Sequence, residues 1–169
     1  MSHYTIAPES PENSSAIEQL HALTFGPGRF ARAAFRLREE GPHDLSLSSC
    51  AIVDLDGTKR LVGSVRLTWV SVGDAELQGL LLGPLAVDPT LKGQGIGRSL
   101  MTAAVKSGRE SDAAFILLVG DEAFYKPYGF EVVTGLIDMP GPVDRKRLLI
   151  NWLKPDKRME LSGRVCYAA

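Results

Sequence analysis

Two nearly uninterrupted apolar stretches, residues 79–87 and 113–120, lie in the middle of the chain. Their composition predicts strands that are buried on both faces of a sheet. Between them, an apolar stripe at helical spacing runs from Ile96 to Gly108 and predicts an amphipathic helix. A strand, a helix and a strand in this order predict a right-handed crossover, in which the two strands are parallel neighbours.

The chain before these stretches shows strand and helix patterns of its own. Residues 46–55 and 60–72 are rich in β-branched and apolar residues and flank Asp56-Gly57, a dipeptide typical of hairpin turns. We therefore expect them to be antiparallel neighbours. Shorter patterns predict a strand over residues 3–7, helices that begin at Pro11 (with Ser10 as N-cap) and at Arg29, a short helix within 121–130, and strands over 130–134 and 147–153.

The predicted helix over residues 29–40 ends before Gly41, a residue typical of helix C-termini. Its apolar side chains, which include Phe30, Phe35 and Leu37, are expected to be buried.

Gly83-Pro84 interrupts the first of the two buried strands. Proline cannot donate a hydrogen bond to a neighbouring strand, and glycine adopts backbone conformations that other residues avoid. A mid-strand pair of this kind predicts a β-bulge, or a point at which pairing with one neighbour ends.

The composition narrows the classes of function. A chain of 169 residues with 44% hydrophobic residues is long enough for one well-buried domain and too short for two, so we expect a single domain over residues 1–169. A formal charge of −1 and the lack of a long apolar stretch favour neither nucleic-acid nor membrane partners. Cys50 and Cys166 make no disulfide framework and the N-terminus shows no signal-peptide pattern, so a cytoplasmic protein is expected.

Glycines occupy alternate positions in the loop after the first buried strand, at Gly93, Gly95 and Gly97. This spacing does not match the G-x-G-x-x-G fingerprint of dinucleotide-binding folds, and no window matches the G-x-x-x-x-G-K-[ST] of a P-loop. The loop nevertheless precedes a helix whose first N–H groups lack partners and carry positive partial charge. It therefore favours a backbone site for a phosphate or pyrophosphate, with an ordinary strand-to-helix turn as the alternative.

The segment Lys92–Gly97, KGQGIG, resembles the Q/R-x-x-G-x-G/A pyrophosphate loop of the GNAT superfamily of acetyl-coenzyme A-dependent N-acetyltransferases. Further along, FYKPYGF resembles the family's Y-x-x-x-G-F segment, with Tyr125, Gly129 and Phe130 in register. The resemblance covers residues 79–130. Within this range the sequence is similar to the YhbS-like branch of small bacterial acetyltransferases. It implies a GNAT-like α/β (α+β) fold, in which a mostly antiparallel mixed sheet contains a splayed parallel pair, strands 4 and 5, and is flanked by helices.

The resemblance also implies a reaction and a set of site residues. Acetyl-CoA would be the cosubstrate, and an amine of a small molecule or peptide would attack its thioester directly in a ternary complex. The implied coenzyme-binding residues are Leu85, Ala86, Val87, Lys92, Gly93, Gln94, Gly95, Ile96, Gly97, Arg98 and Ser99. The backbone N–H of Val87 would stabilise the oxyanion. Tyr125, a phenol with a pKa near 10, would protonate the leaving thiolate as general acid, with a packing role as the alternative.

The general base and the acceptor are not identified by the sequence. Strand 79–87 holds no carboxylate, so the base candidates are Asp74, Glu76, His43 and a water-mediated route. Arginines occur at Arg29, Arg32, Arg36 and Arg38. We expect most of them to be solvated, with an acidic acceptor or the coenzyme's 3′-phosphate as the alternative ligand.

Two other classes of function are left open. One is a non-catalytic module that binds acyl-CoA and reports its level to a partner. The other is an unrelated α/β domain that binds a different phosphate compound. The three histidines show no metal-ligand spacing, so no metal is expected, and a homodimer is left open.

Overall fold

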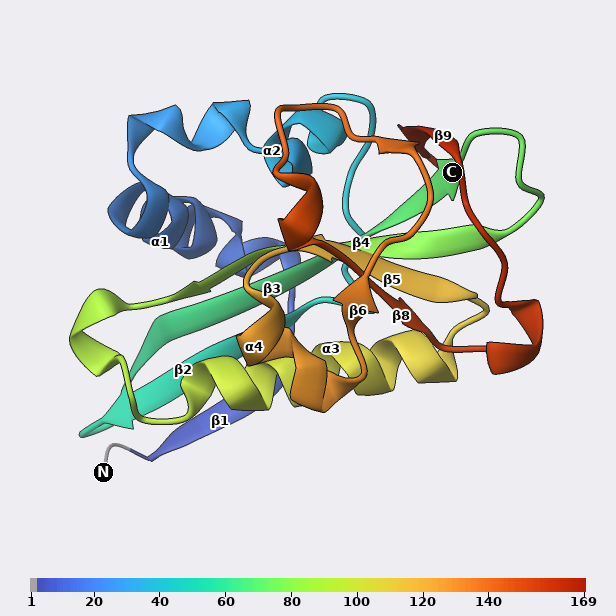
Figure 1. The fold of residues 1–169 in the computed structure, drawn as a ribbon. Helices are drawn as coiled ribbons and strands as arrows, with labels where there is room; N and C mark the ends of the chain where they lie inside the picture. The colour runs from blue at the N-terminus through green and yellow to red at the C-terminus, as the bar shows by residue number, and fades with distance from the viewer. Residues whose placement is uncertain (1–2) are drawn as a thin grey trace.

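Residues 3–169 are described by the computed structural model and form a mixed nine-stranded sheet with helices on both faces (Figure 1). The order is β1-β2-β3-β4-β5-β8-β6, and β9 pairs with β3 and β7. The strands are β1 (Tyr4–Pro8), β2 (Ser49–Leu55), β3 (Thr58–Val72), β4 (Gln78–Val87), β5 (Phe115–Val119), β6 (Glu131–Val132), β7 (Ile137–Asp138), β8 (Leu148–Trp152) and β9 (Gly163–Tyr167). The α-helices are α1 (Ser14–Phe25), α2 (Ala33–Arg38), α3 (Ile96–Glu110) and α4 (Glu122–Tyr125).

The predicted hairpin between β2 and β3 is confirmed. Leu55 pairs with Thr58 across a two-residue turn in which Asp56 has φ 53° and Gly57 has φ 85°. Positive φ at both central residues is the conformation that matches the twist of the flanking strands, which is why Asp-Gly is typical of such turns.

The predicted parallel pair is also confirmed, and it is short. Strands β4 and β5 pair only at Leu80 with Ile116 and at Leu81 with Leu117. Gly83-Pro84 follows at once in β4, and the register with β3 shifts by one residue at the same place. Both effects predicted from this dipeptide therefore occur, because β4 bulges against β3 and its pairing with β5 ends. Beyond Leu81, β4 has β3 as its only strand partner in the described chain.

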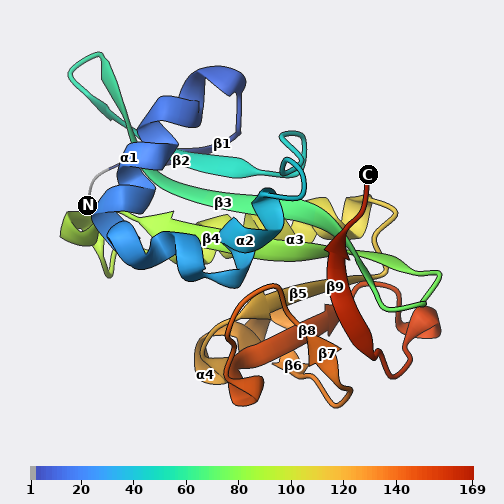
Figure 2. The ribbon, with the colours of Figure 1, turned by 90° about the horizontal axis from the view of Figure 1, so that it is seen from above.

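Alternate residues of the central strands pack on opposite faces of the sheet. Leu80 and Leu82 join the core that includes the buried stripe of α3, from Ile96 to Gly108. Leu81 joins the second core, which includes α2. Figure 2 shows α1 and α2 on the face of the sheet opposite to α3. Different helices thus cover the two faces of the sheet. The β4–β5 splay lies between α3 on one face and α1 and α2 on the other.

Two sequence-based expectations require correction, and two strands were missed. The helix expected over residues 29–40 is broken, because a 3₁₀ turn ends at Ala31 and α2 begins only at Ala33. Phe30, expected to be buried, is 56% exposed as a result. Strands β7 and β9 were not predicted, because each depends on partners distant in sequence.

Candidate active site

A cleft of about 740 Å³ passes through the splay between β4 and β5. One wall is the end of β4 from Leu81 to Val87, and the other is the end of β5 with α4. Its lining includes Gly97, which belongs to α3 on one face of the sheet, and Phe35, which belongs to α2 on the other. Residues from helices on both faces of the sheet therefore line the cleft. Its volume is in the usual range of a small-molecule site.

The backbone of β4 turns free polar groups toward this cleft. Asp88 N–H donates to the carbonyl of Val62 at 2.8 Å, so the next opposed pair, Gly63 and Val87, is not hydrogen-bonded. The N–H and C=O of Val87 therefore point away from β3, and those of Leu85 do the same. Since β5 no longer pairs at this level, these groups face the splay.

The loop after β4 ends at a helix N-terminus. Gly93 and Gly95 have φ values of 82° and 84°, the left-handed region in which glycine is favoured, and Gly95 is the N-cap of α3. No side chain caps this end of the helix, so its first N–H groups are available to an anion. Lys92 and Gly97 bring this end of the helix to the cleft.

The sequence-predicted residues are divided by the structure into two groups. Those that line the cleft are Leu85, Val87, Lys92, Gly97 and Tyr125. Those outside its lining are Ala86, Gly93, Gln94, Gly95, Ile96, Arg98 and Ser99. Ala86 is 1% exposed and forms the hydrogen-bonded pair with Ser64, so its backbone groups face β3. The hydroxyl of Ser99 lies 2.8 Å from that of Tyr4, with which it shares a hydrogen bond.

Tyr125 stands at the end of α4 and borders the cleft. Its ring packs edge-on against Phe124 and Phe130, at centroid distances of 4.8 and 6.0 Å. Burial, together with the nearby carboxylate of Asp121, raises the pKa of Tyr125 above its ordinary value. The phenol is therefore protonated at neutral pH, as a proton donor must be.

None of the three candidate bases lines the cleft. Asp74 and Glu76 lie in the turn between β3 and β4. His43 instead holds Glu9, with Nε2 2.9 Å from Oε1. The carboxylate that does line the cleft is Asp121, two residues after the end of β5, and its Oδ1 lies 3.3 Å from Nε of Arg147.

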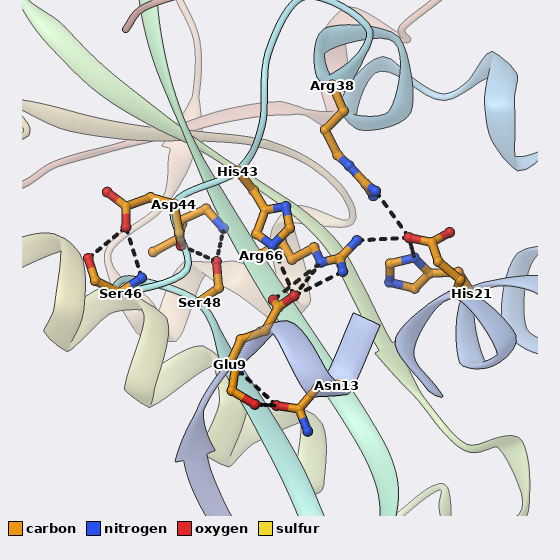
Figure 3. A network of polar contacts seen from close by, with 12 residues as sticks. Glu9, Asn13, His21, Arg38, His43, Asp44, Ser46, Ser48 and Arg66 are labelled. Atoms are coloured by element: carbon orange, nitrogen blue, oxygen red, sulfur yellow. Dashed lines mark hydrogen bonds and ion pairs between the residues drawn. The ribbon is translucent and has the colours of Figure 1, made fainter. Parts of the chain in front are cut away.

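Glu9 belongs to a buried polar network beneath α1 and α2 (Figure 3). Arg66 of β3, opposite the bulge of β4, is 1% exposed and donates to both carboxylate oxygens of Glu9 and to Glu18 of α1. Arg38 of α2 donates to the same oxygen of Glu18 at 3.1 Å. Burial acts to raise the pKa of Glu9, but the hydrogen bonds from His43 and Arg66 outweigh it and hold that pKa below its usual value. The network ties β1, α1 and α2 to the sheet, which fixes one wall of the cleft.

Several cleft residues were missed by sequence reasoning. Asp121 and Arg147 lie far apart in sequence and meet only in the fold. Phe124 was not among the predicted site residues, and it is 41% exposed and borders the cleft. Arg32 is exposed, as was expected for most of the four arginines, and it also lines the cleft. The only available signal was the position of Asp121 immediately after a buried strand, where polar residues often belong to sites.

Neither Cys50 nor a cluster of metal ligands provides a competing site within residues 3–169. Cys50 is fully buried, and burial raises the pKa of its thiol to about 12, so it is protonated at neutral pH. Within residues 3–169, no group of three His, Cys, Asp or Glu side chains could hold a metal ion. The helices of this part of the chain are also too short or too polar to cross a bilayer.

Comparison with known proteins was made for the sequence and for the fold. The family model described as acetyltransferase (GNAT) domain matches residues 47–132. The uncharacterized N-acetyltransferase YhbS of Escherichia coli K12 is 32% identical over 124 residues, which cover 73% of this chain and 71% of the relative. A second Escherichia coli K12 relative, the uncharacterized N-acetyltransferase YjhQ, is 25% identical over 140 residues, or 83% of this chain and 76% of that protein.

Solved structures give the same result. The crystal structure of Escherichia coli YhbS in complex with CoA superposes with a TM-score of 0.80 at 28% identity, covering 99% of this chain and 91% of that one. A GNAT acetyltransferase of Brucella melitensis, in complex with acetyl-CoA, has the same fold, with a TM-score of 0.68 at 24% identity over 100% of this chain and 98% of that one. The chain belongs to the GNAT family of N-acetyltransferases.

Proposed function

We propose that this protein transfers the acetyl group of acetyl-CoA to an amine by direct attack within a ternary complex. The observation that carries this proposal is the cleft through the β4–β5 splay, whose lining includes residues at the N-terminus of α3 and residues of α1 and α2. A cleft reached from both faces allows the two substrates to meet without a covalent enzyme intermediate. Cys50, the cysteine nearest the core, is buried and is not in its lining.

The coenzyme fits the side of the cleft that α3 borders. Gly97 leaves the helix N-terminus accessible, since a β-carbon there would meet only a Val87 methyl group at 3.8 Å, and one at Gly93 would meet nothing within 4 Å. Backbone N–H groups and the Lys92 ammonium supply positive charge for a pyrophosphate. The free backbone groups of Leu85 and Val87 offer hydrogen bonds to the amides of a pantetheine arm. The crystal structure of the related YhbS in complex with CoA supports CoA as the ligand of this fold.

Val87 is the residue that we assign to the oxyanion. When the amine nitrogen bonds to the thioester carbon, negative charge develops on the carbonyl oxygen. A backbone N–H that is already oriented and has no partner in the sheet stabilises that charge without reorganisation. The N–H of Val87 meets this description because its pair with Gly63 is of the non-hydrogen-bonded kind.

Tyr125 is the residue that we assign to the leaving group. The acceptor ammonium first loses one proton, which leaves through water at the solvent-exposed end of the cleft. After the neutral amine has bonded to the thioester carbon, collapse of the tetrahedral intermediate breaks the C–S bond, and the thiolate takes the phenolic proton of Tyr125. The nitrogen, which is positively charged after attack, gives up its second proton, and that proton restores the Tyr125 phenol through water. Asp121, whose side chain is 79% exposed, is the carboxylate at that end.

A second candidate function, an acyl-CoA sensor without catalysis, makes a different prediction for one substitution. Tyr125→Phe removes the hydroxyl and keeps the ring that packs on Phe124 and Phe130. For the enzyme, kcat with a turned-over amine falls about 100-fold or more while the Kd of acetyl-CoA stays unchanged. Tyr128→Phe is the matched control, because Tyr128 lies outside the cleft lining, and its kcat should stay within two-fold of wild type, a margin of about 0.4 kcal/mol.

The assay measures release of the CoA thiol, and isothermal titration measures the Kd of acetyl-CoA. A Tyr125→Phe variant with full kcat would contradict the assignment of the acid. Tight binding of acetyl-CoA with no turnover of any amine would instead support the sensor.

A further inference from the structure

We propose that the acceptor is an amine that also carries a carboxylate, and that Arg32 binds that carboxylate. This inference rests on the proposed function, because it concerns the second substrate of the same cleft. It follows from how charge is distributed over the cleft lining and from the way in which the chain holds Arg32.

The ionisable side chains of the lining are unbalanced. Among residues 3–169, its cations are Arg32, Lys92 and Arg147, and its only carboxylate is that of Asp121. Lys92 lies beside the α3 N-terminus, where the coenzyme phosphates are placed. Arg147 is already paired with Asp121. Arg32 is therefore the cation of the α1–α2 side whose charge is not balanced within the cleft.

Arg32 is exposed, and its guanidinium lies beside the ring of Phe25 at the edge of the cleft. Its backbone is extended, with φ −71° and ψ 145°, which separates the 3₁₀ turn before it from α2. Its guanidinium stacks on the ring of Phe25, 4.5 Å from the centroid, and Phe25 also lines the cleft. Within the described chain no carboxylate lies within 4.0 Å of it, whereas Arg38, from the same segment, is engaged with Glu18. An arginine stacked in this way keeps its planar donors free for an anion.

The loop segment 141–143 packs beside Arg32. Gly141 packs on the backbone around Arg32, so closely that a β-carbon there would lie 3.0 Å from the Ala31 carbonyl oxygen. Pro142 and Val143, which follow, line the cleft. Arg32 thus lies where its own segment meets residues 141–143. The side chains around its free guanidinium are mostly apolar. The bidentate fork of arginine matches a carboxylate in such a setting.

The same charges act against acceptors that are purely cationic. A polyamine would bring additional positive charge toward Arg32 and Arg147, with Asp121 as the only compensation. An amino acid or related compound brings one negative charge for Arg32 and one amine for the thioester. Fixing the acid also fixes the amine relative to the reacting carbon, which is the positional contribution that a bound substrate makes to rate.

The test is a panel of matched acceptors with acetyl-CoA. Each amino acid is assayed beside its amide and its decarboxylated amine: phenylalanine with phenylalaninamide and phenethylamine, and lysine with lysinamide and cadaverine. We expect kcat/KM to be at least ten-fold higher for the acids of the preferred series. In Arg32→Gln we expect kcat/KM for the acid to fall about ten-fold relative to that for its amide and its decarboxylated amine. Arg36→Gln, on the exposed surface of α2, should retain the wild-type preference.

Two results would overturn the proposal. One is equal or better turnover of the amides and decarboxylated amines, or no response to any acid-bearing amine. The other is an Arg32→Gln variant that binds CoA more weakly but 3′-dephospho-CoA normally, which would assign Arg32 to the coenzyme's 3′-phosphate. Failure of the proposed function is recognised separately, because the wild-type protein would then fail to bind acetyl-CoA or to acetylate any amine of the panel.

Discussion

Gly120 lies directly against the ring of Tyr125. A β-carbon on Gly120 would be 3.0 Å from Cδ2 of that ring and closer still to Cε2. The backbone of Gly120 is itself fixed, because its N–H donates to the carbonyl of Arg147 at 2.9 Å. The absence of a side chain at residue 120 therefore sets the position of the ring, and with it the hydroxyl that we assign as the proton donor.

Gly120→Ala tests this relationship. The added methyl group must displace the Tyr125 ring, since the backbone cannot move without losing its bond to Arg147. Displacement of a reacting group by about 1 Å can cost about 100-fold in rate, so we expect kcat to fall about 10- to 100-fold with a small change in the Kd of acetyl-CoA. Gly28→Ala is the control, because a β-carbon on Gly28 meets nothing within 4 Å. A Gly120→Ala variant with unchanged kcat would show that the exact ring position is unimportant.

Val87→Pro tests the backbone N–H that we assign to the oxyanion. Proline removes that N–H and nothing from the ladder with β3, because the pair with Gly63 is not hydrogen-bonded. The residue before it, Ala86, is already in the extended conformation that a following proline requires. We expect kcat to fall about 100- to 1,000-fold, the cost of losing one oxyanion donor.

The control for this variant is Val87→Ala, which shortens the side chain and keeps the N–H. Its kcat should remain within about ten-fold of wild type, and its thermal unfolding midpoint should be similar to that of Val87→Pro. Equal kcat losses in the two variants would mean that the Val87 side chain matters and its N–H does not.

Lys92→Gln tests the charge at the coenzyme end of the cleft. Lys92 is exposed and lines the cleft beside the N-terminus of α3. Removing a charge-assisted contact to the pyrophosphate should raise the Kd of CoA about ten-fold at low salt, and by less at high salt because of screening. Lys106→Gln, on the exposed side of α3 and paired with Glu110, is the matched control. The Kd of pantetheine, which lacks the pyrophosphate, should not change in either variant. A uniform loss for CoA and pantetheine would contradict this assignment.

Local patterns predicted the centre of the fold well. The strand–helix–strand unit, the hairpin at Asp56-Gly57 and the break at Gly83-Pro84 all depend on residues close in sequence, whose backbone preferences act without help from the rest of the chain. The glycine loop and the segment that contains Tyr125 were recognisable for the same reason. Their positions on either side of one cleft follow from the parallel crossover.

Long-range relationships were not predictable in this way. The helix from Arg29 is broken at Arg32, and the side chain of that residue stacks on Phe25 of the preceding helix. His43 was a candidate base from its place in a loop, but its actual partner is Glu9 of the buried network. Neither contact leaves a periodic signal, because each depends on the relative placement of elements that only the complete fold determines.

His21 provides the clearest prediction of pH-dependent stability. Its ring is fully buried against Phe35, and within the described residues neither nitrogen has a hydrogen-bond partner. Burial, and then the positive charge of Arg66, lower the pKa of His21 from 6.5 to about 4. Between pH 6.5 and 4, His21 is protonated in the unfolded chain but neutral in the folded chain. The contribution of this group to the free energy of unfolding is therefore fully present above pH 6.5 and is lost as the pH falls toward 4. Between pH 7.5 and 5 the free energy of unfolding should fall by about 2 kcal/mol from this group.

His21→Leu should remove that part of the slope in urea unfolding measured across this range, and His3→Gln, at an exposed histidine, should preserve it. An identical slope in wild type and His21→Leu would assign the pH dependence to other groups.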